Sequence, residues 1–234
     1  GNPGASTANA AGINGQAVTM GLGATVDGRI RHTNPAGGTN AYLARLSGNA
    51  NTPGVLWLID RLWQNSGLSV TSTAAQAITP AALPARSGDG TANGANVMAM
   101  MEWSATGGAG VPTVTLTYTD QDGNTGNTGT ITGVATPPVG TCEIFTLAAG
   151  DTGIRAPTSF IQSATRTSGT MHLVLFRLLA TLEVTSANIG NAIDAITGGR
   201  PRIYDDSTLQ LLWIPSATTA SVICGTYIET HVIP

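Results

Sequence analysis

The stretch of residues 113–131 constrains the fold of this chain more than any other, because it carries the pattern of a β-hairpin. Val114, Leu116 and Tyr118 alternate with threonines, which is the period of a strand with one buried and one solvated face. Residues 120–127 are rich in Asp, Gly and Asn, which form tight turns, and a β-branched segment follows them. The chain is therefore expected to contain antiparallel strands.

Further strands are expected at steady intervals along the rest of the chain. Alternation or β-branched composition predicts them at residues 97–104, 142–147, 159–165, 170–179, 209–214 and 221–228. The first of these strands and the hairpin should form a three-stranded meander. This regular spacing of strands is typical of an antiparallel β-sandwich, which we expect to be of the jelly-roll type.

One or two short helices are expected within this β pattern. Apolar side chains at helical spacing predict the first within residues 54–70, and the relevant residues are Leu56, Ile59, Leu62 and Trp63. The second is expected at residues 186–197, where Ile189, Ile193 and Ile196 follow a capping Ser or Asn.

Residues 1–54 show no sustained period and are expected to form an extended N-terminal arm, followed by a β-sandwich domain at residues 55–234. Such an arm becomes ordered by lying on another surface. Its candidate interaction residues are Asp27, Arg29 and Arg31, together with Tyr42 at the start of a short apolar piece.

Charge is scarce in this sequence, and that excludes some classes of partner. Only 10% of residues are charged, against the usual quarter, and every basic side chain except histidine is an arginine. A net charge of −3 without a basic run argues against nucleic-acid binding. No apolar run approaches the ~20 residues that span a bilayer, and no secretory signal is visible, so we expect a soluble chain without a membrane partner. A surface of such low charge is often covered by neighbouring subunits.

The hairpin turn contains half of a calcium-binding pattern. Asp120, Asp122 and Asn124 stand at positions 1, 3 and 5 of the loop, where oxygen ligands are needed. Thr125 replaces the required Gly, and Ile131 replaces the bidentate Glu. We therefore expect an ordinary turn, with a calcium site as the weaker alternative.

The remaining titratable side chains give no catalytic motif. His32, His172 and His231 have no second ligand at metal spacing, and no G-x-S-x-G elbow provides a nucleophile. Cys142 and Cys224 form no metal motif and are expected to be reduced, buried thiols, although a disulfide is open if their strands are adjacent. We predict that the chain is not an enzyme and uses no cofactor.

Two charged groups are expected to have structural roles. Asp151 and Arg155 are four residues apart in a loop and should form an ion pair that fixes the turn. Residues 200–206 interleave both signs, with Arg200 and Arg202 before Asp205 and Asp206. We expect a salt network within the domain or between subunits there.

Several segments resemble an uncharacterised family of virion structural proteins from tailed bacteriophages. They occur in consistent order over residues 55–220, as WLIDRLWQNSGLSVTSTAAQ (57–76), TVTLTYTDQDGNTGNTGTI (113–131), IFTLAAGDTGIRAPTSF (144–160), HLVLFRLLA (172–180) and RIYDDSTLQLLWIPSATTA (202–220). The family usually carries an Arg shortly after the DG of the hairpin turn, where this chain has Asn127 and Thr128.

The resemblance implies a structural component of a phage virion, and in particular a capsid decoration (cement) protein on the outside of the head. Such a protein is expected to be a homotrimer that binds the major capsid protein and bridges capsomers, in a virion assembled in the host cytoplasm. Two alternatives stay open: a component of the tail or adsorption apparatus, and a carbohydrate-binding module or hydrolase of sandwich fold.

Overall fold

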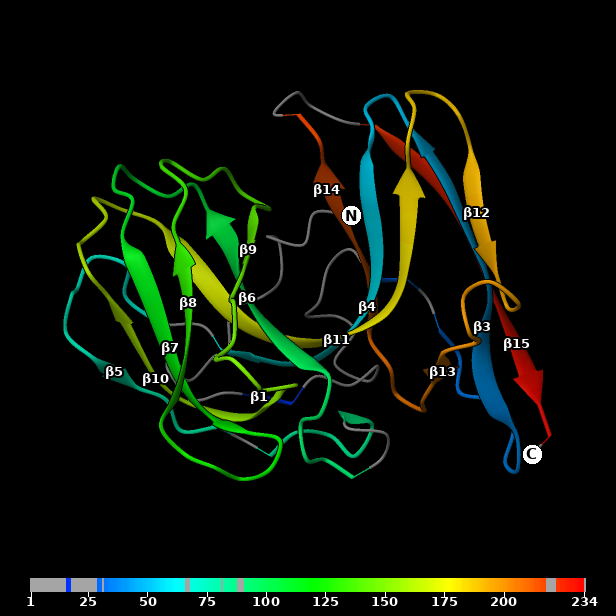
Figure 1. Cartoon of the computed structure of the whole chain (residues 1–234), viewed down its shortest axis with the longest axis horizontal. Helices are drawn as coiled ribbons and strands as arrows, with labels where there is room; N and C mark the ends of the chain where they lie inside the picture. The colour runs from blue at the N-terminus through cyan, green and yellow to red at the C-terminus, as the bar shows by residue number, and fades with distance from the viewer. Residues whose placement is uncertain are drawn as a thin grey trace. The chain divides into compact units, whose positions relative to one another are not determined.

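The computed structural model describes residues 16–17, 29–30, 32–65, 68–80, 82–87, 91–217 and 222–233. Over these residues the chain is mainly β, as predicted, with antiparallel pairing and no helix. The strands, in chain order, are β1 (Gln16–Ala17), β2 (Arg29–Ile30), β3 (Asn40–Ala50), β4 (Gly54–Asn65), β5 (Gln76–Ala77), β6 (Val97–Ala105), β7 (Thr113–Asp120), β8 (Asn127–Thr132), β9 (Cys142–Ile144), β10 (Ile154–Gln162), β11 (Thr170–Val184), β12 (Asn191–Asp194), β13 (Arg202–Ile203), β14 (Leu209–Pro215) and β15 (Ile223–Val232) (Figure 1).

These strands divide into two compact units. The first unit contains residues 61–177 together with the N-terminal residues up to 29, and the second contains residues 30–60 and 178–234. The boundary falls inside β4 and β11, so each of these strands contributes residues to both units. The second unit is therefore discontinuous in sequence.

The first unit has a core shared by two sheets. One sheet has the order β5-β10-β7-β8, and in the other β6 lies between β11 and β9. Alternate residues of β6 enter this core, namely Val97, Ala99, Met101 and Trp103. The opposite sheet contributes a corresponding set that includes Val114, Leu116, Tyr118 and Phe160. Burying alternate side chains from both sheets provides the apolar stabilisation of the unit.

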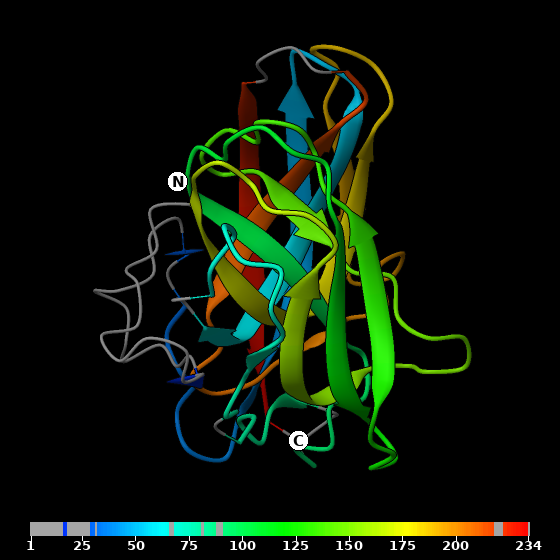
Figure 2. The same ribbon diagram turned by 90° about the vertical axis from the view of Figure 1, so that its left-hand side faces the viewer.

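The predicted hairpin is confirmed as β7 and β8, which appear as paired green strands in Figures 1 and 2. Its register places Val114 opposite Ile131 and Leu116 opposite Gly129. The predicted meander is wrong, because β6 pairs with β11 and β9 instead of β7. A Gly-rich connection signals a turn, but it does not determine whether the flanking strands pair with each other.

The second unit is built around β3. On one side β3 pairs with β15 over the whole length of that strand, and on the other it pairs with β12 and β13. Facing this sheet, β14, β4 and β11 follow one another in a second layer (Figure 1). A second core lies between these layers, formed by Ala41, Leu43, Leu46, Leu56, Leu58, Ala180, Leu182, Ile203 and Leu209.

The helix predicted within residues 54–70 is wrong, since residues 54–65 form β4. Leu56, Ile59, Leu62 and Trp63 are all buried, but so are most of the residues between them. A strand covered on both faces has no polar alternation, so its apolar side chains can match a helical spacing by chance.

The helix predicted at residues 186–197 is also wrong. The segment forms turns around β12, and Ile189 and Ile196 are exposed, so no apolar face exists. The carboxylate of Asp194 accepts hydrogen bonds from the backbone N–H groups of Ile196 and Thr197, each at 3.0 Å. Such local bonding by Asp offers the backbone an alternative to the helix.

Residues 40–50, which the sequence places in the extended arm, form β3 at the centre of the second unit's sheet. The strand alternates buried and less buried positions, so Ala41, Leu43 and Leu46 enter the core. The sequence pattern hides this strand, because Gly48 and small or polar residues interrupt its apolar positions.

Replacing Phe160 by Ala should destabilise the first unit by roughly 3–5 kcal/mol, because Phe160 is fully buried and the substitution leaves a cavity. Urea unfolding followed by tryptophan fluorescence measures the loss. The matched control is Ile161→Ala on the next residue of β10, whose side chain is 37% exposed. It should cost less than about 1 kcal/mol. Equal losses would contradict the assignment of Phe160 to the core.

Candidate functional site

The outer face of the β3 sheet, meaning the face turned away from the second core, carries a cluster of arginines and tyrosines. Tyr42 on β3 lies opposite Arg202 on β13. The Arg200 guanidinium lies 5.2 Å from the ring centroid of Tyr42, and that of Arg202 lies 4.4 Å from the ring of Tyr204. Arg202 also donates a 2.7 Å hydrogen bond to the side chain of Asn40. We call Tyr42, Arg200, Arg202 and Tyr204 the arginine–tyrosine cluster.

Stacking fixes these guanidinium groups while leaving them accessible. Both arginines are exposed, whereas the two tyrosines are half-buried. A cation over an aromatic face is stabilised by the ring quadrupole, and less side-chain entropy is then lost when the arginine binds a partner. Arginine and tyrosine are enriched where proteins bind one another. The cluster therefore has the composition of a protein-binding surface.

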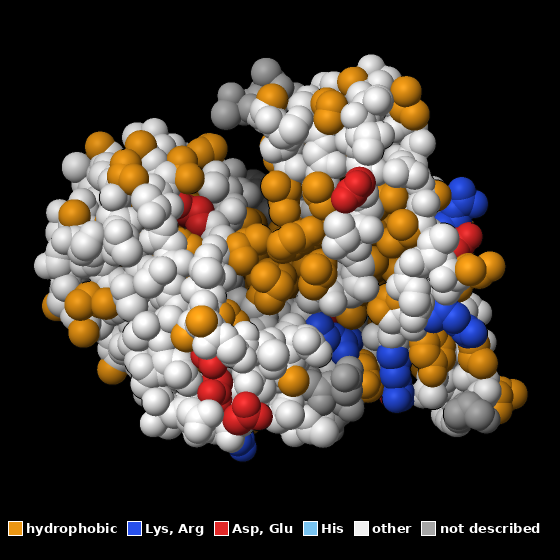
Figure 3. All heavy atoms as spheres, in the orientation of Figure 1, with side chains coloured by type: hydrophobic (Ala, Val, Ile, Leu, Met, Phe, Trp, Pro, Cys, Tyr) orange, Lys and Arg blue, Asp and Glu red, His pale blue; other side chains and the backbone are white. Residues whose placement is uncertain are grey.

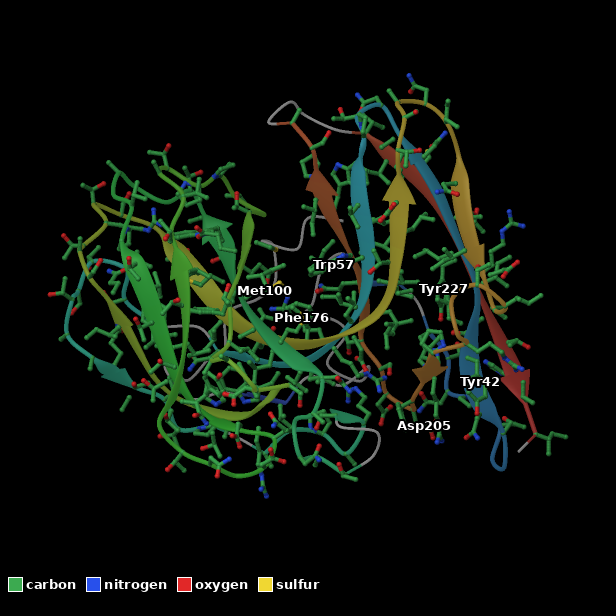
Figure 4. The ribbon with its side chains drawn as sticks, in the orientation of Figure 1. Tyr42, Trp57, Met100, Phe176, Asp205 and Tyr227 are labelled. Carbon is green, nitrogen blue, oxygen red and sulfur yellow. The ribbon has the colours of Figure 1, made fainter. Side chains whose placement is uncertain are left out.

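A second polar site lies on the inner face of the same sheet and is centred on Glu229 of β15. Its carboxylate accepts a 2.6 Å hydrogen bond from the Tyr227 hydroxyl and bonds with His32 Nδ1 at 2.9 Å and His231 Nε2 at 3.1 Å. Figure 4 shows Tyr227 between the layers of the second unit, where it packs on the second core. His32 is buried, while His231 is 39% exposed in its side chain.

These contacts stabilise the carboxylate form of Glu229. Burial opposes ionisation, but the hydrogen bonds from Tyr227, His32 and His231 outweigh it and hold the pKa of Glu229 below its ordinary value. Burial, together with the adjacent carboxylate, raises the pKa of Tyr227. Sequence reasoning missed this group, because His32 and Glu229 are 197 residues apart. The contacts attach the start of the second unit to its last strand, which is a structural role.

An open groove of about 770 Å³ lies at one end of the β3 sheet. Its lining includes Arg45, Asn49, Asn191, Cys224 and Thr226, and it contains neither histidine nor carboxylate. A cysteine nucleophile needs a neighbouring base or a lowered pKa. The groove therefore places a thiol among amides, hydroxyls and one guanidinium group, without a histidine or carboxylate to act as a base.

The two thiols are free and differ in their surroundings. Cys224 is exposed on β15, so the prediction of a buried thiol is wrong there. Cys142 on β9 is half-buried, and burial together with nearby Glu102 raises the pKa of its thiol to about 12. Cys142 thus stays protonated at neutral pH.

The buried charged side chains of the first unit contact one another or buried polar side chains. Arg61 and Glu102 make a 2.6 Å ion pair with both side chains fully buried, and Gln64 accepts a further bond from Arg61. His172 lies on β11 directly opposite Glu102. Elsewhere, Trp103 Nε1 donates to Glu143 at 2.6 Å. These side chains are buried, so their role is in the packing of the core.

Asp120 of the half calcium pattern fixes the hairpin turn. Its Oδ1 accepts the backbone N–H groups of Asp122 and Asn124, each at 2.9 Å, and its Oδ2 accepts the side-chain amides of Asn124 and Asn127. These bonds, led by that of the Asn124 side chain, hold the pKa of Asp120 below its ordinary value. Among the described residues, no three His, Cys, Asp or Glu side chains are grouped to hold a metal ion.

The other predicted site residues are not brought together. Asp27 and Arg31 lie outside the described residues, and Arg29 belongs to β2. The predicted Asp151–Arg155 pair is wrong, since Asp151 instead accepts a 2.6 Å hydrogen bond from the hydroxyl of Tyr118. Burial and that bond raise the pKa of Tyr118 to about 12.

The predicted salt network at residues 200–206 stays a prediction, and the contacts found there are of other kinds. Asp206 binds Asn34 through its carboxylate at 3.1 Å and through its backbone N–H at 2.9 Å. The two arginines instead stack on tyrosines. Charged side chains are few and scattered on the face drawn in Figure 3, which agrees with the composition.

Comparisons of the chain with protein-family models, curated proteins and solved structures found no match. In the part of the chain that the structure describes, no helix is long and apolar enough to cross a bilayer.

Replacing Glu229 by Gln should lower the free energy of unfolding at pH 7 by roughly 1–3 kcal/mol, because charge-assisted hydrogen bonds become neutral ones. Since the folded-state pKa of Glu229 is lowered, its stabilisation is present above the unfolded value of about 4.3 and is lost as the pH falls through the folded value. The variant should lose this part of the acid dependence in urea titrations between pH 3 and 7. Glu183→Gln, at an exposed position, is the control and should keep it.

Replacing Asp120 by Ala should destabilise the first unit by about 1–2 kcal/mol, since the turn loses the acceptor for its N–H groups. Millimolar calcium should leave the melting temperature of the unmodified chain unchanged, because both carboxylate oxygens are already engaged. Differential scanning fluorimetry with calcium, magnesium and a chelator measures both effects. A calcium-specific rise that Asp120→Ala abolishes would establish the metal site instead.

Proposed function

We propose that this chain is a structural component of a tailed-phage particle, and specifically a decoration protein that binds the outside of the head as a trimer. The resemblance over residues 55–220 motivates the proposal. The observation that carries it is the arginine–tyrosine cluster, in which Arg200 and Arg202 are stacked and exposed on a sheet face. The predicted jelly-roll topology is part of this proposal.

The cluster suits an acidic protein partner, because a guanidinium group binds a carboxylate in bidentate fashion. We assign the major capsid protein to that role. A trimer that contacts neighbouring capsomers binds the assembled shell and not the free subunits, so by mass action it stabilises the shell. Weak individual contacts become strong when three copies of the surface engage together.

The surface around the cluster supports the same role. Hydroxyl groups contribute to it, with Thr226 and Thr230 on the same sheet face. Such a surface loses little solvation energy when covered, because few charges must be desolvated.

Double substitution of Arg200 and Arg202 by Ala should weaken binding to phage heads that lack the decoration protein by at least about tenfold, as expected for a binding hot spot. Co-sedimentation of purified chain with such heads measures the affinity, and cryo-electron microscopy locates the bound chain. Arg155→Ala is the matched control, since Arg155 is an exposed arginine of the first unit.

Four outcomes would overturn the proposal. Density for the chain in the tail would show an adsorption or tail role, and equal loss for both variants would exclude the cluster. A strictly monomeric mass in light scattering would exclude the proposed trimer. A specific melting-temperature rise with a sugar would favour the carbohydrate-binding alternative.

A further inference from the structure

β15 is a long strand that pairs on one side. It pairs with β3 from Ile223 to Val232, and among the described residues it pairs with no other strand. A free strand edge presents unpaired N–H and C=O groups that can bind another chain. Natural edges are usually protected by lysine, proline or a bulge, and β15 contains no lysine or proline.

Large apolar side chains are exposed along this edge. Ile228, in the middle of the strand, is 45% exposed, and Val222 and Ile233 beside its two ends are 69% and 79% exposed. The irregularity in its pairing lies between the partners of Ile228 and Glu229 on β3, where the register skips Ala44. β15 itself therefore alternates regularly.

The outer-face side chains of β15 form a nearly palindromic pattern of residue types along the strand. In order they are Cys224, Thr226, Ile228, Thr230 and Val232, which is an apolar–Thr–Ile–Thr–apolar pattern centred on Ile228. An antiparallel copy related by a two-fold axis at this residue would place Ile228 opposite its equivalent. It would place Thr226 opposite Thr230 of the copy, and Cys224 opposite Val232. Apolar and Thr–Thr cross-strand pairs of this kind stabilise antiparallel sheets.

The inner-face residues also match in this register. Ile223 falls opposite Ile233, and Tyr227 falls opposite Glu229 of the copy, so no two like charges face each other. Shifting the axis by one residue to Glu229 would bring two carboxylates opposite each other, which is unfavourable. The two faces therefore favour the same axis.

We infer that β15 is a self-pairing edge, along which two copies of this chain join in antiparallel fashion about a two-fold axis at Ile228. The contact is isologous, so one surface supplies both halves, and main-chain hydrogen bonds extend the β3 sheet from one copy into the next. This inference does not depend on the proposed function. In a lattice, such a contact would connect one oligomer to its neighbour.

Cysteine cross-linking tests both the partner and the register. In a Cys224→Ser background, Ile228→Cys should form a disulfide-linked dimer on mild oxidation, because the two residues would face each other across the axis. Ile214→Cys on β14 is the control, with similar exposure of 39% in the same unit. We expect at least fivefold more dimer from Ile228→Cys, measured by non-reducing electrophoresis.

The single variants Thr226→Cys and Thr230→Cys should cross-link poorly alone but efficiently when mixed. Absence of dimer from Ile228→Cys, equal dimer from Ile214→Cys, or strong self-linking of Thr230→Cys would overturn the inference.

A second measurement avoids cysteine altogether. Ile228→Lys places a charge at the centre of the edge, where the exposed side chain does not contribute to the core. Sedimentation equilibrium should show that the mass of the unmodified chain doubles with concentration, and that the variant requires at least tenfold higher concentration. An unchanged melting temperature shows that the variant is folded. A mass that never doubles, or an unaffected variant, would contradict self-pairing.

Discussion

Main-chain pairing of β3 is the interaction on which the second unit depends. β3 holds β15 on one side and β12 and β13 on the other, while its alternate side chains form the core with β4 and β11. The Glu229 contacts add a polar attachment at the end of this sheet, between β15 and His32. Two surfaces are proposed for binding, the arginine–tyrosine cluster and the β15 edge. Pairing with β3 positions the strands that form both of them.

Scarce charge is used in two different ways in this chain. In the first unit, Arg61 and Glu102 are fully buried and paired, so that removing either partner would leave an uncompensated buried charge. In the second unit, Arg200 and Arg202 are exposed and held by aromatic rings. The first pair is buried in the core, and the second pair lies at the surface. A chain with few ionisable groups thus places some of its arginines in a core and others on a sheet face.

Local patterns predicted the β class and the hairpin, because alternation in Val114, Leu116 and Tyr118 reports directly on a half-buried strand. They failed for β4, which is buried on both faces, and for β3, whose apolar positions are interrupted by small residues. The Glu229 group and the stacking of Arg200 on Tyr42 join residues more than 150 positions apart. No spacing rule captures such contacts, since they arise from the pairing of strands that are remote in sequence.

The pairing of Ile223 with Ala50 has a consequence for the synthesis of the chain. Roughly 170 residues separate these partners, and ribosomes add about 5–20 residues per second, so β3 waits on the order of ten to thirty seconds for β15. The first unit's residues 61–177 emerge during that interval and can fold first. Until the last strand leaves the ribosome, β3 presents an unpaired edge in the crowded cell. Chaperone binding during translation would then protect the chain from association with its nascent neighbours.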